Sequence, residues 1–208
     1  MDGVIVNNHQ YHFKAWMEFA SRYNFELDEE IYRDKFNGKT NKDLFQMIFD
    51  DPTEEEIATY SDEKETLYRD LYYDDLTPHT GVLDFLTALQ KRGYKIGLGT
   101  SAPTENVDFV LDNLQLRSFF DVIVDGSEVE NGKPDPEIYL TVCDRLEVEP
   151  KYAVVFEDSI AGLESAIAAE CTAVGVATSH EPFELEGKTQ FIIHDFSEVR
   201  GLWMRLER

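Results

Sequence analysis

The sequence has few cysteines and no long hydrophobic run. Cys143 and Cys171 are the only cysteines among 208 residues, too few for a disulfide scaffold and too far apart for a zinc knuckle. This usage favours a reducing compartment, so we expect a cytoplasmic protein. No apolar stretch approaches the roughly 20 residues of a membrane-spanning helix, and the N-terminal residues lack the basic and apolar regions of a signal peptide. We therefore expect no membrane association.

Positive charge is also scarce. The chain has 19 Lys and Arg residues against 42 Asp and Glu residues, which gives a formal net charge of −23. Such a surface repels nucleic-acid phosphates and anionic lipids, so we expect no nucleic-acid partner. An anionic substrate would need a local cluster of cations, helix N-termini or a metal ion. The 42% hydrophobic content is enough for one core, with or without a small inserted lobe.

The pattern of apolar residues changes along the chain. From His9 to Asp75 they recur at spacings of three and four, which predicts a small all-helical unit. From Thr77 onward, short β-branched runs alternate with amphipathic helices, which predicts right-handed crossovers and a doubly wound parallel sheet, an α/β fold. The predicted strands are Lys95–Gly99, Asp121–Val124, Tyr152–Phe156, Thr172–Val176 and Gln190–Ile193. The predicted helices between them are Val82–Arg92, Thr104–Leu114, Pro136–Leu146 and Ile160–Ala169.

Polar residues follow three of these strands. Thr100 and Ser101 follow the first, Asp125 the second with Lys133 a few residues later, and Glu157-Asp158 the third. In parallel sheets ligands bind beyond the carboxyl ends of the strands. Carboxylates can hold a hard cation there, while the cation, a lysine and hydroxyl groups neutralise phosphoryl oxygens. The pattern is therefore typical of a magnesium-dependent phosphoryl site.

Each of these motifs also has a purely structural explanation. The acidic pair Glu157-Asp158 could start a helix capped by Ser159, and Lys133 could be a solvated turn residue. Thr100 and Ser101 could cap the helix that begins near Thr104. Their occurrence in this order on successive strand ends favours the functional interpretation.

Four segments together resemble the ordered motifs of the haloacid dehalogenase superfamily. They are Met1-Asp-Gly-Val4, Thr100-Ser101, Gly132-Lys-Pro-Asp-Pro136 and Phe156-Glu-Asp-Ser-Ile-Ala-Gly162. The match covers essentially the whole chain. The helical unit after the first motif resembles the cap of the subgroup that contains β-phosphoglucomutase and small sugar-phosphate phosphatases. The resemblance implies a Rossmann-like core formed by residues 1–8 and 76–208, and a helical cap formed by residues 9–75.

The resemblance also implies roles for individual residues. Asp2 would be the general acid and base, and Thr100 with the Ser101 N–H would bind the phosphoryl group whose charge Lys133 compensates. Magnesium would be held by the Asp2 carbonyl and the Asp158 side chain, with Glu157 ordering a metal-bound water. The implied substrate is a small phosphorylated metabolite. We expect a monomer or a weak homodimer.

One departure from the family concerns the nucleophile. The first motif of the family is Asp-x-Asp-Gly, and Met1 occupies the position x, so the nucleophilic Asp and its apolar strand would precede Met1. The sequence could begin inside a longer protein, it could be truncated, or the natural protein could be an inactive binding or regulatory relative. Because the downstream motif residues all persist, we predict an upstream strand that ends in Asp.

Candidate substrate residues in the helical unit are His12, Lys39, Asn41 and Lys64, whereas Trp16 shares an apolar helix face and is expected in the core. Asn41 stands where β-phosphoglucomutases place an arginine, although Lys39 or Lys42 could supply a point charge. The sequence therefore predicts a magnesium-dependent phosphatase that acts through a phospho-aspartate. The alternatives are a hexose phosphate mutase and the inactive binding protein.

Overall fold

A computed structural model describes residues 1–36, 40–189 and 191–199, which divide into two compact units. One unit contains Met1–Asn7 and the chain from Thr77 onward, and the other contains Asn8–Leu76. Asn8 and Leu76, which the sequence assigns to the α/β domain, thus belong to the helical unit. Within the described residues, no helix is both long and apolar enough to cross a membrane.

The described part of the smaller unit contains helices and no strand. Its α-helices are α1 (His9–Tyr23), α2 (Glu29–Ile31), α3 (Asn41–Ile48) and α4 (Glu54–Tyr72). A π-helical turn covers Tyr32–Phe36, and a 3-10 turn covers Tyr73–Asp75. A capping box begins α4: the Thr53 hydroxyl accepts from the Glu56 N–H at 3.2 Å, and the Glu56 carboxylate accepts from the Thr53 N–H at 2.8 Å.

Aromatic side chains form the core of the helical unit. Trp16 and Phe19 of α1 pack against Phe45 of α3, with ring centroids 5.4 Å apart in both pairs. Trp16 is only 3% exposed, so its predicted place in the core is confirmed. Such rings bury large apolar areas and favour tilted or edge-on contacts, which define how α1 and α3 pack.

The larger unit is an α/β fold, as predicted. Every strand pairing is parallel. The strands are β1 (Gly97–Gly99), β2 (Val122–Val124), β3 (Val154–Glu157), β4 (Thr172–Val176) and β5 (Phe191–Ile193). The α-helices are α5 (Val82–Lys91), α6 (Thr104–Asn113), α7 (Glu137–Arg145), α8 (Ile160–Ala168) and α9 (Pro182–Leu185). Short 3-10 turns cover Arg117–Phe119, Pro150–Tyr152 and Phe196–Glu198.

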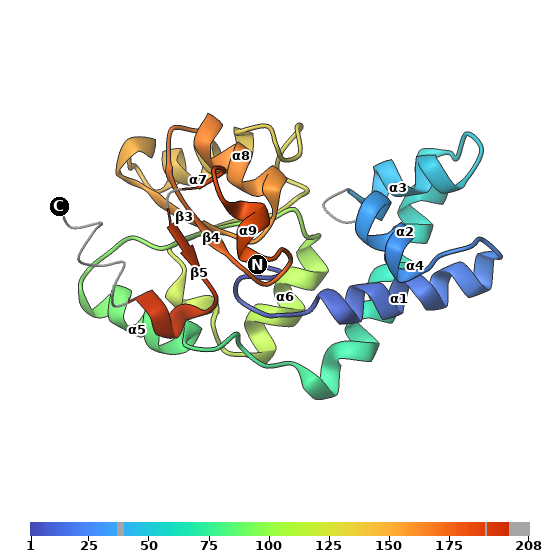
Figure 1. Cartoon of the computed structure of the whole chain (residues 1–208), viewed down its shortest axis with the longest axis horizontal. Helices are drawn as coiled ribbons and strands as arrows, with labels where there is room; N and C mark the ends of the chain where they lie inside the picture. Colours follow the sequence, from blue (N-terminus) through green and yellow to red (C-terminus); the bar gives the residue numbers. More distant parts are fainter. Residues whose placement is uncertain (37–39, 190, 200–208) are drawn as a thin grey trace. The chain divides into compact units, whose positions relative to one another are not determined.

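The described strands form two sheets, whereas the sequence predicts one sheet that includes a further strand upstream of Met1. The first sheet has the order β1-β2 and the second has the order β3-β4-β5. Helix α7 contacts β1 and β2, helix α8 contacts β3 and β4, and the two helices contact each other, so one helical layer covers both sheets. In Figure 1, α7 and α8 lie on one side of β3–β5 and α5 lies on the other.

The division of the sheet has a simple physical reason. A parallel strand needs a hydrogen-bonding neighbour, and no described segment pairs with both β1 and β3. Nevertheless, one continuous apolar cluster joins the sheets through Val124, Val142, Leu163 and Ala173. A strand between β1 and β3 would complete a single parallel sheet. That upstream strand stays a prediction.

We expect Thr53→Ala to lower the free energy of unfolding of the helical unit by about 1 kcal/mol, because it removes the N-cap hydroxyl of α4. Chemical denaturation followed by circular dichroism measures the change. Thr59→Ala is the matched control, since Thr59 is an exposed residue inside the same helix. The capping role is refuted if the two variants lose equal stability.

Candidate active site

The residues predicted to bind phosphate follow β1. The Thr100 N–H donates to the Val124 carbonyl at 3.0 Å, which fixes Thr100 at the carboxyl end of the first sheet. Its hydroxyl accepts from the Ala102 N–H at 3.2 Å, and the residue is buried. Ser101 is exposed. A side chain at Gly126 would overlap the Ser101 carbonyl, so a glycine after β2 lets the two loops approach.

Lys133 and Glu157 form a buried ion pair. The Lys133 ammonium contacts Glu157 Oε1, and the side chains are 12% and 7% exposed. The Tyr139 hydroxyl donates to the same oxygen, while the Ser159 hydroxyl donates to Glu157 Oε2 at 3.1 Å. Both charged residues are predicted from the sequence, Lys133 for the phosphoryl group and Glu157 for a metal-bound water. The structure instead brings them into direct contact and adds Tyr139.

This arrangement has a clear electrostatic consequence. Burial opposes ionisation of Glu157, but the Lys133 charge and hydrogen bonds from Lys133 and Tyr139 outweigh it and lower the Glu157 pKa to about 2. Burial and the Glu157 charge raise the pKa of Tyr139 well above its ordinary value. At neutral pH Glu157 is therefore an ionised carboxylate that accepts hydrogen bonds from the neutral Tyr139 phenol and from Lys133.

Asp2 and Asp158 lie at a second, adjoining point. The Met1 carbonyl accepts from the Ile5 N–H at 2.7 Å, which closes a tight turn through Asp2 and Gly3. Gly3 has a φ of +66°, and a Cβ there would overlap the Asp158 carboxylate. Asp158 is only 6% exposed. The Asp158 carboxylate therefore lies directly against the backbone of the turn that carries Asp2.

The residues at this point fit a magnesium ion. Among the described residues no group of three or more His, Cys, Asp and Glu side chains could hold a metal. Magnesium needs less: one or two carboxylates, with water and substrate oxygens completing the shell. Asp158 and the Asp2 turn offer such oxygen ligands beside Gly3, where any side chain would overlap the Asp158 carboxylate. Both Glu157 oxygens accept protein hydrogen bonds, so this geometry favours Glu157 as the partner of Lys133.

The candidate residues of the helical unit converge on Glu65. Its Oε1 accepts from Lys64 at 2.7 Å and from the Asn41 amide at 2.8 Å. Lys64 is also 3.1 Å from His12 Nδ1. Burial opposes ionisation of Glu65, but the charges of Lys64 and His12 and two hydrogen bonds lower its pKa to about 2. The three predicted residues thus belong to one polar cluster.

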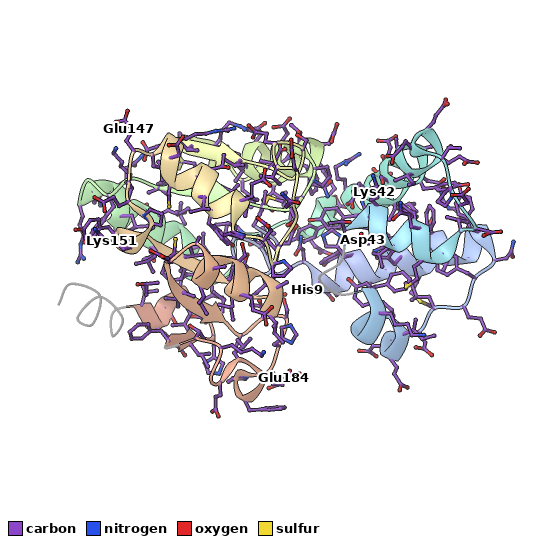
Figure 2. All side chains as sticks on the ribbon, turned by 90° about the horizontal axis from the view of Figure 1, so that it is seen from above. His9, Lys42, Asp43, Glu147, Lys151 and Glu184 are labelled. Carbon is purple, nitrogen blue, oxygen red and sulfur yellow. The ribbon has the colours of Figure 1, made fainter. Side chains whose placement is uncertain are left out.

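Lys42, from the same prediction, is engaged by another carboxylate. Lys42 pairs with Glu54 at 2.8 Å in an exposed ion pair. Figure 2 shows Lys42 next to Asp43 at the beginning of α3. Lys39 lies outside the described residues.

The sequence did not predict four residues that contact the candidate site residues: Tyr139, Glu65, Thr178 and Ser179. The Thr178 hydroxyl donates to the Gly3 carbonyl at 2.5 Å, and the Ser179 hydroxyl donates to Asp158 Oδ2. For Glu65 a signal existed, because two charged residues interrupt the buried face of α4 between Ile57 and Tyr68. The two loop hydroxyls carry no such signal, since their partners are distant in sequence.

We expect Glu157→Gln to reduce the loss of stability in acid. A folded pKa of about 2 lies below the ordinary glutamate value, so this carboxylate stabilises the protein above that value and loses the effect as pH falls from about 5 toward about 2. Urea unfolding at stepped pH values measures the slope. The exposed Glu170→Gln variant should keep the parental slope. Identical slopes for Glu157→Gln and the parent would contradict the expectation.

Gly162→Ala tests the space around the same carboxylate. A Cβ at Gly162 would overlap the Glu157 carboxylate and displace it from Lys133 and Tyr139. We expect the free energy of unfolding to fall by about 1–3 kcal/mol, although alanine ordinarily stabilises a helix interior. Ala168→Ser, on the exposed face of α8, is the control. A stabilised Gly162→Ala protein would show that the carboxylate has room to move.

Comparison with known proteins places this geometry in a family. The sequence model of the haloacid dehalogenase-like hydrolase family matches residues 1–176. A phosphorylated carbohydrates phosphatase of Thermotoga maritima is 34% identical over 80% of this chain and 77% of its own length. The β-phosphoglucomutase of Bacillus subtilis is 30% identical over 85% and 80%, respectively.

A solved structure agrees with the sequence relatives. The crystal structure of a family IA, variant 3 hydrolase from Entamoeba histolytica is 28% identical, covers 100% of this chain and 97% of its own, and superposes with a TM-score of 0.90. The four sequence motifs, the α/β unit and these matches all agree. The chain therefore belongs to the haloacid dehalogenase-like hydrolase family.

Proposed function

We propose that the protein is a magnesium-dependent phosphatase that hydrolyses monoesters of small phosphorylated metabolites, sugar phosphates in particular, through a phospho-aspartate. The observation that carries this proposal is the buried Lys133–Glu157 pair directly before Asp158, in the same α/β unit as Thr100 at the carboxyl end of β1. The relatives support an enzyme of the phosphatase type, since the Thermotoga maritima protein is a phosphatase of phosphorylated carbohydrates.

The phosphoryl group would be bound by Thr100, the Ser101 N–H and Lys133. Lys133 provides a cation in a chain whose net charge is −23. Its ammonium contacts Glu157 and lies 4.9 Å from the centre of the Tyr139 ring, so its position is fixed before substrate arrives. A preorganised charge costs no reorganisation when negative charge shifts during phosphoryl transfer.

Asp2 would act as the general acid and base. Its carboxyl group would protonate the leaving oxygen and then take a proton from the attacking water. The backbone of the tight turn at Gly3, which directly follows Asp2, lies against the Asp158 carboxylate. When bound at the Asp2 carbonyl and the Asp158 side chain, magnesium would neutralise phosphoryl oxygens.

The attacking carboxylate is assigned to the residue that would precede Met1. The Met1 nitrogen supports this assignment, because Met1 is buried in the same unit as Asp2, Lys133, Glu157 and Asp158. A residue joined to that nitrogen would enter the buried cluster. Its side chain would then lie among the groups that bind the phosphoryl group.

A mutase is the second candidate because of the Bacillus subtilis relative. A mutase must hold a bisphosphate by both phosphates, which requires a second free cationic site. In the described helical unit the Asn41 amide and Lys64 both contact Glu65, and Lys42 pairs with Glu54. None of Asn41, Lys42 and Lys64 is an arginine, the side chain that binds a phosphate by two parallel hydrogen bonds. The geometry therefore favours hydrolysis.

We expect the protein, when it includes the attacking carboxylate proposed to precede Met1, to release inorganic phosphate from several sugar monophosphates in the presence of magnesium. Phosphorus NMR with β-glucose 1-phosphate and a trace of bisphosphate should show free phosphate and negligible 6-phosphate.

Lys133→Met should lower kcat/KM at least about 100-fold, because it removes the preorganised charge. Lys151→Met is the control, since Lys151 is an exposed lysine of the same unit that pairs with Glu149.

Two results would contradict the proposal. Clean conversion to the 6-phosphate without free phosphate would identify a mutase. A folded protein that binds sugar phosphates without turnover would be the inactive binding relative.

A further inference from the structure

The loop at residues 177–181 connects β4 to α9 and is anchored at both ends. The Ala177 N–H donates to the Ile193 carbonyl at 2.8 Å, which extends the pairing between β4 and β5. At the other end Glu181 and Glu184 form a capping box that begins α9. Glu184 is labelled on α9 in Figure 2. The residues between these anchors have a defined backbone position.

Two hydroxyl groups of this loop contact the two sides of the proposed metal site. The Thr178 hydroxyl donates to the Gly3 carbonyl at 2.5 Å, and the Ser179 hydroxyl donates to Asp158 Oδ2. These partners lie far away in the sequence, at the first turn and at the end of β3. The loop therefore joins the Asp2–Gly3 turn and the Asp158 carboxylate to one rigid support.

Thr178 and Ser179 are both partly exposed, and neither belongs to the apolar cluster that joins the two sheets. The torsion that rotates a carboxylate is soft, whereas a hydrogen bond from a fixed hydroxyl selects one orientation. The bond from Ser179 to Oδ2 therefore fixes the orientation of the Asp158 carboxylate beside the Gly3 turn.

We propose that Ser179 is a positioning residue for the metal ligand Asp158, and that Thr178 supports the Asp2–Gly3 turn in the same way. This inference rests on the proposed function, because it assumes that Asp158 binds magnesium. Hydrogen-bond partners of ligating groups typically change metal affinity by about 10–100-fold. The loop would thus set the affinity of the site without touching the phosphoryl group.

The test compares Ser179→Ala, Ser179→Thr and Ser197→Ala in the full chain. Magnesium binding is measured by calorimetry, and terbium binding is measured by luminescence. Ser179→Ala should bind both ions about 10–100-fold more weakly, whereas Ser179→Thr keeps a hydroxyl and should bind like the parent. Ser197 is the matched control, because its exposed hydroxyl contacts Asp195 Oδ1 at 2.5 Å in another part of the unit.

Two further measurements separate positioning from a structural role. The melting temperature without metal should be unchanged in Ser179→Ala, and the magnesium concentration for half-maximal phosphate release should rise while kcat at saturating magnesium stays near that of the parent. Equal metal affinity in Ser179→Ala and the parent would overturn the inference and leave the proposed function intact. A loss of affinity matched by a lower metal-free melting temperature, or shared by Ser179→Thr, would also overturn it. A parent that binds neither ion would refute the metal site itself.

Discussion

The buried contact between Lys133 and Glu157 is the interaction on which the rest of the site depends. An isolated charge at this depth would be strongly unfavourable, and removing one partner of such a pair typically costs about 3–5 kcal/mol. Here the carboxylate also accepts hydrogen bonds from Tyr139 and Ser159, so its lone pairs are satisfied. Gly162 is required because any larger residue would occupy the space of the carboxylate.

The Glu157 carboxylate also links the two sheets of the α/β unit. Glu157 ends β3 in the second sheet, whereas Tyr139 belongs to α7, which covers β1 and β2 of the first. The hydrogen bond from Tyr139 to Glu157 therefore connects the two sheets, which no described strand joins by pairing with both β1 and β3. Polar contacts at the strand ends and the apolar layer of α7 and α8 both hold the sheets together there.

The sequence predicted the elements and their order better than it predicted side-chain partners. The strand at Thr172–Val176 was predicted with its observed bounds, and α8 differs from its prediction only at its C-terminal end. Periodicity and β-branching are local signals, so they are sufficient for such assignments. The contact of Lys133 with Glu157 was not predictable in this way. The order of motifs after successive strands indicates which residues share one edge of the sheet, but not which of their atoms are in contact. Tyr139 and Ser179 reach the site only through tertiary packing.

Each unit buries a glutamate against a lysine, so the stability of each unit depends on the ionisation of that glutamate. The pKa of Glu65 in the helical unit and that of Glu157 in the α/β unit are both lowered to about 2. Since each is ionised well below the ordinary glutamate pKa, each stabilises its own unit at neutral pH and loses that contribution as pH falls toward about 2. The strongly acidic surface reinforces the pairing, because it excludes other anions while the two carboxylates hold Lys64 and Lys133 in place. The excess of negative charge over the chain is thus compatible with a phosphate site, provided that its cation is fixed by a buried partner.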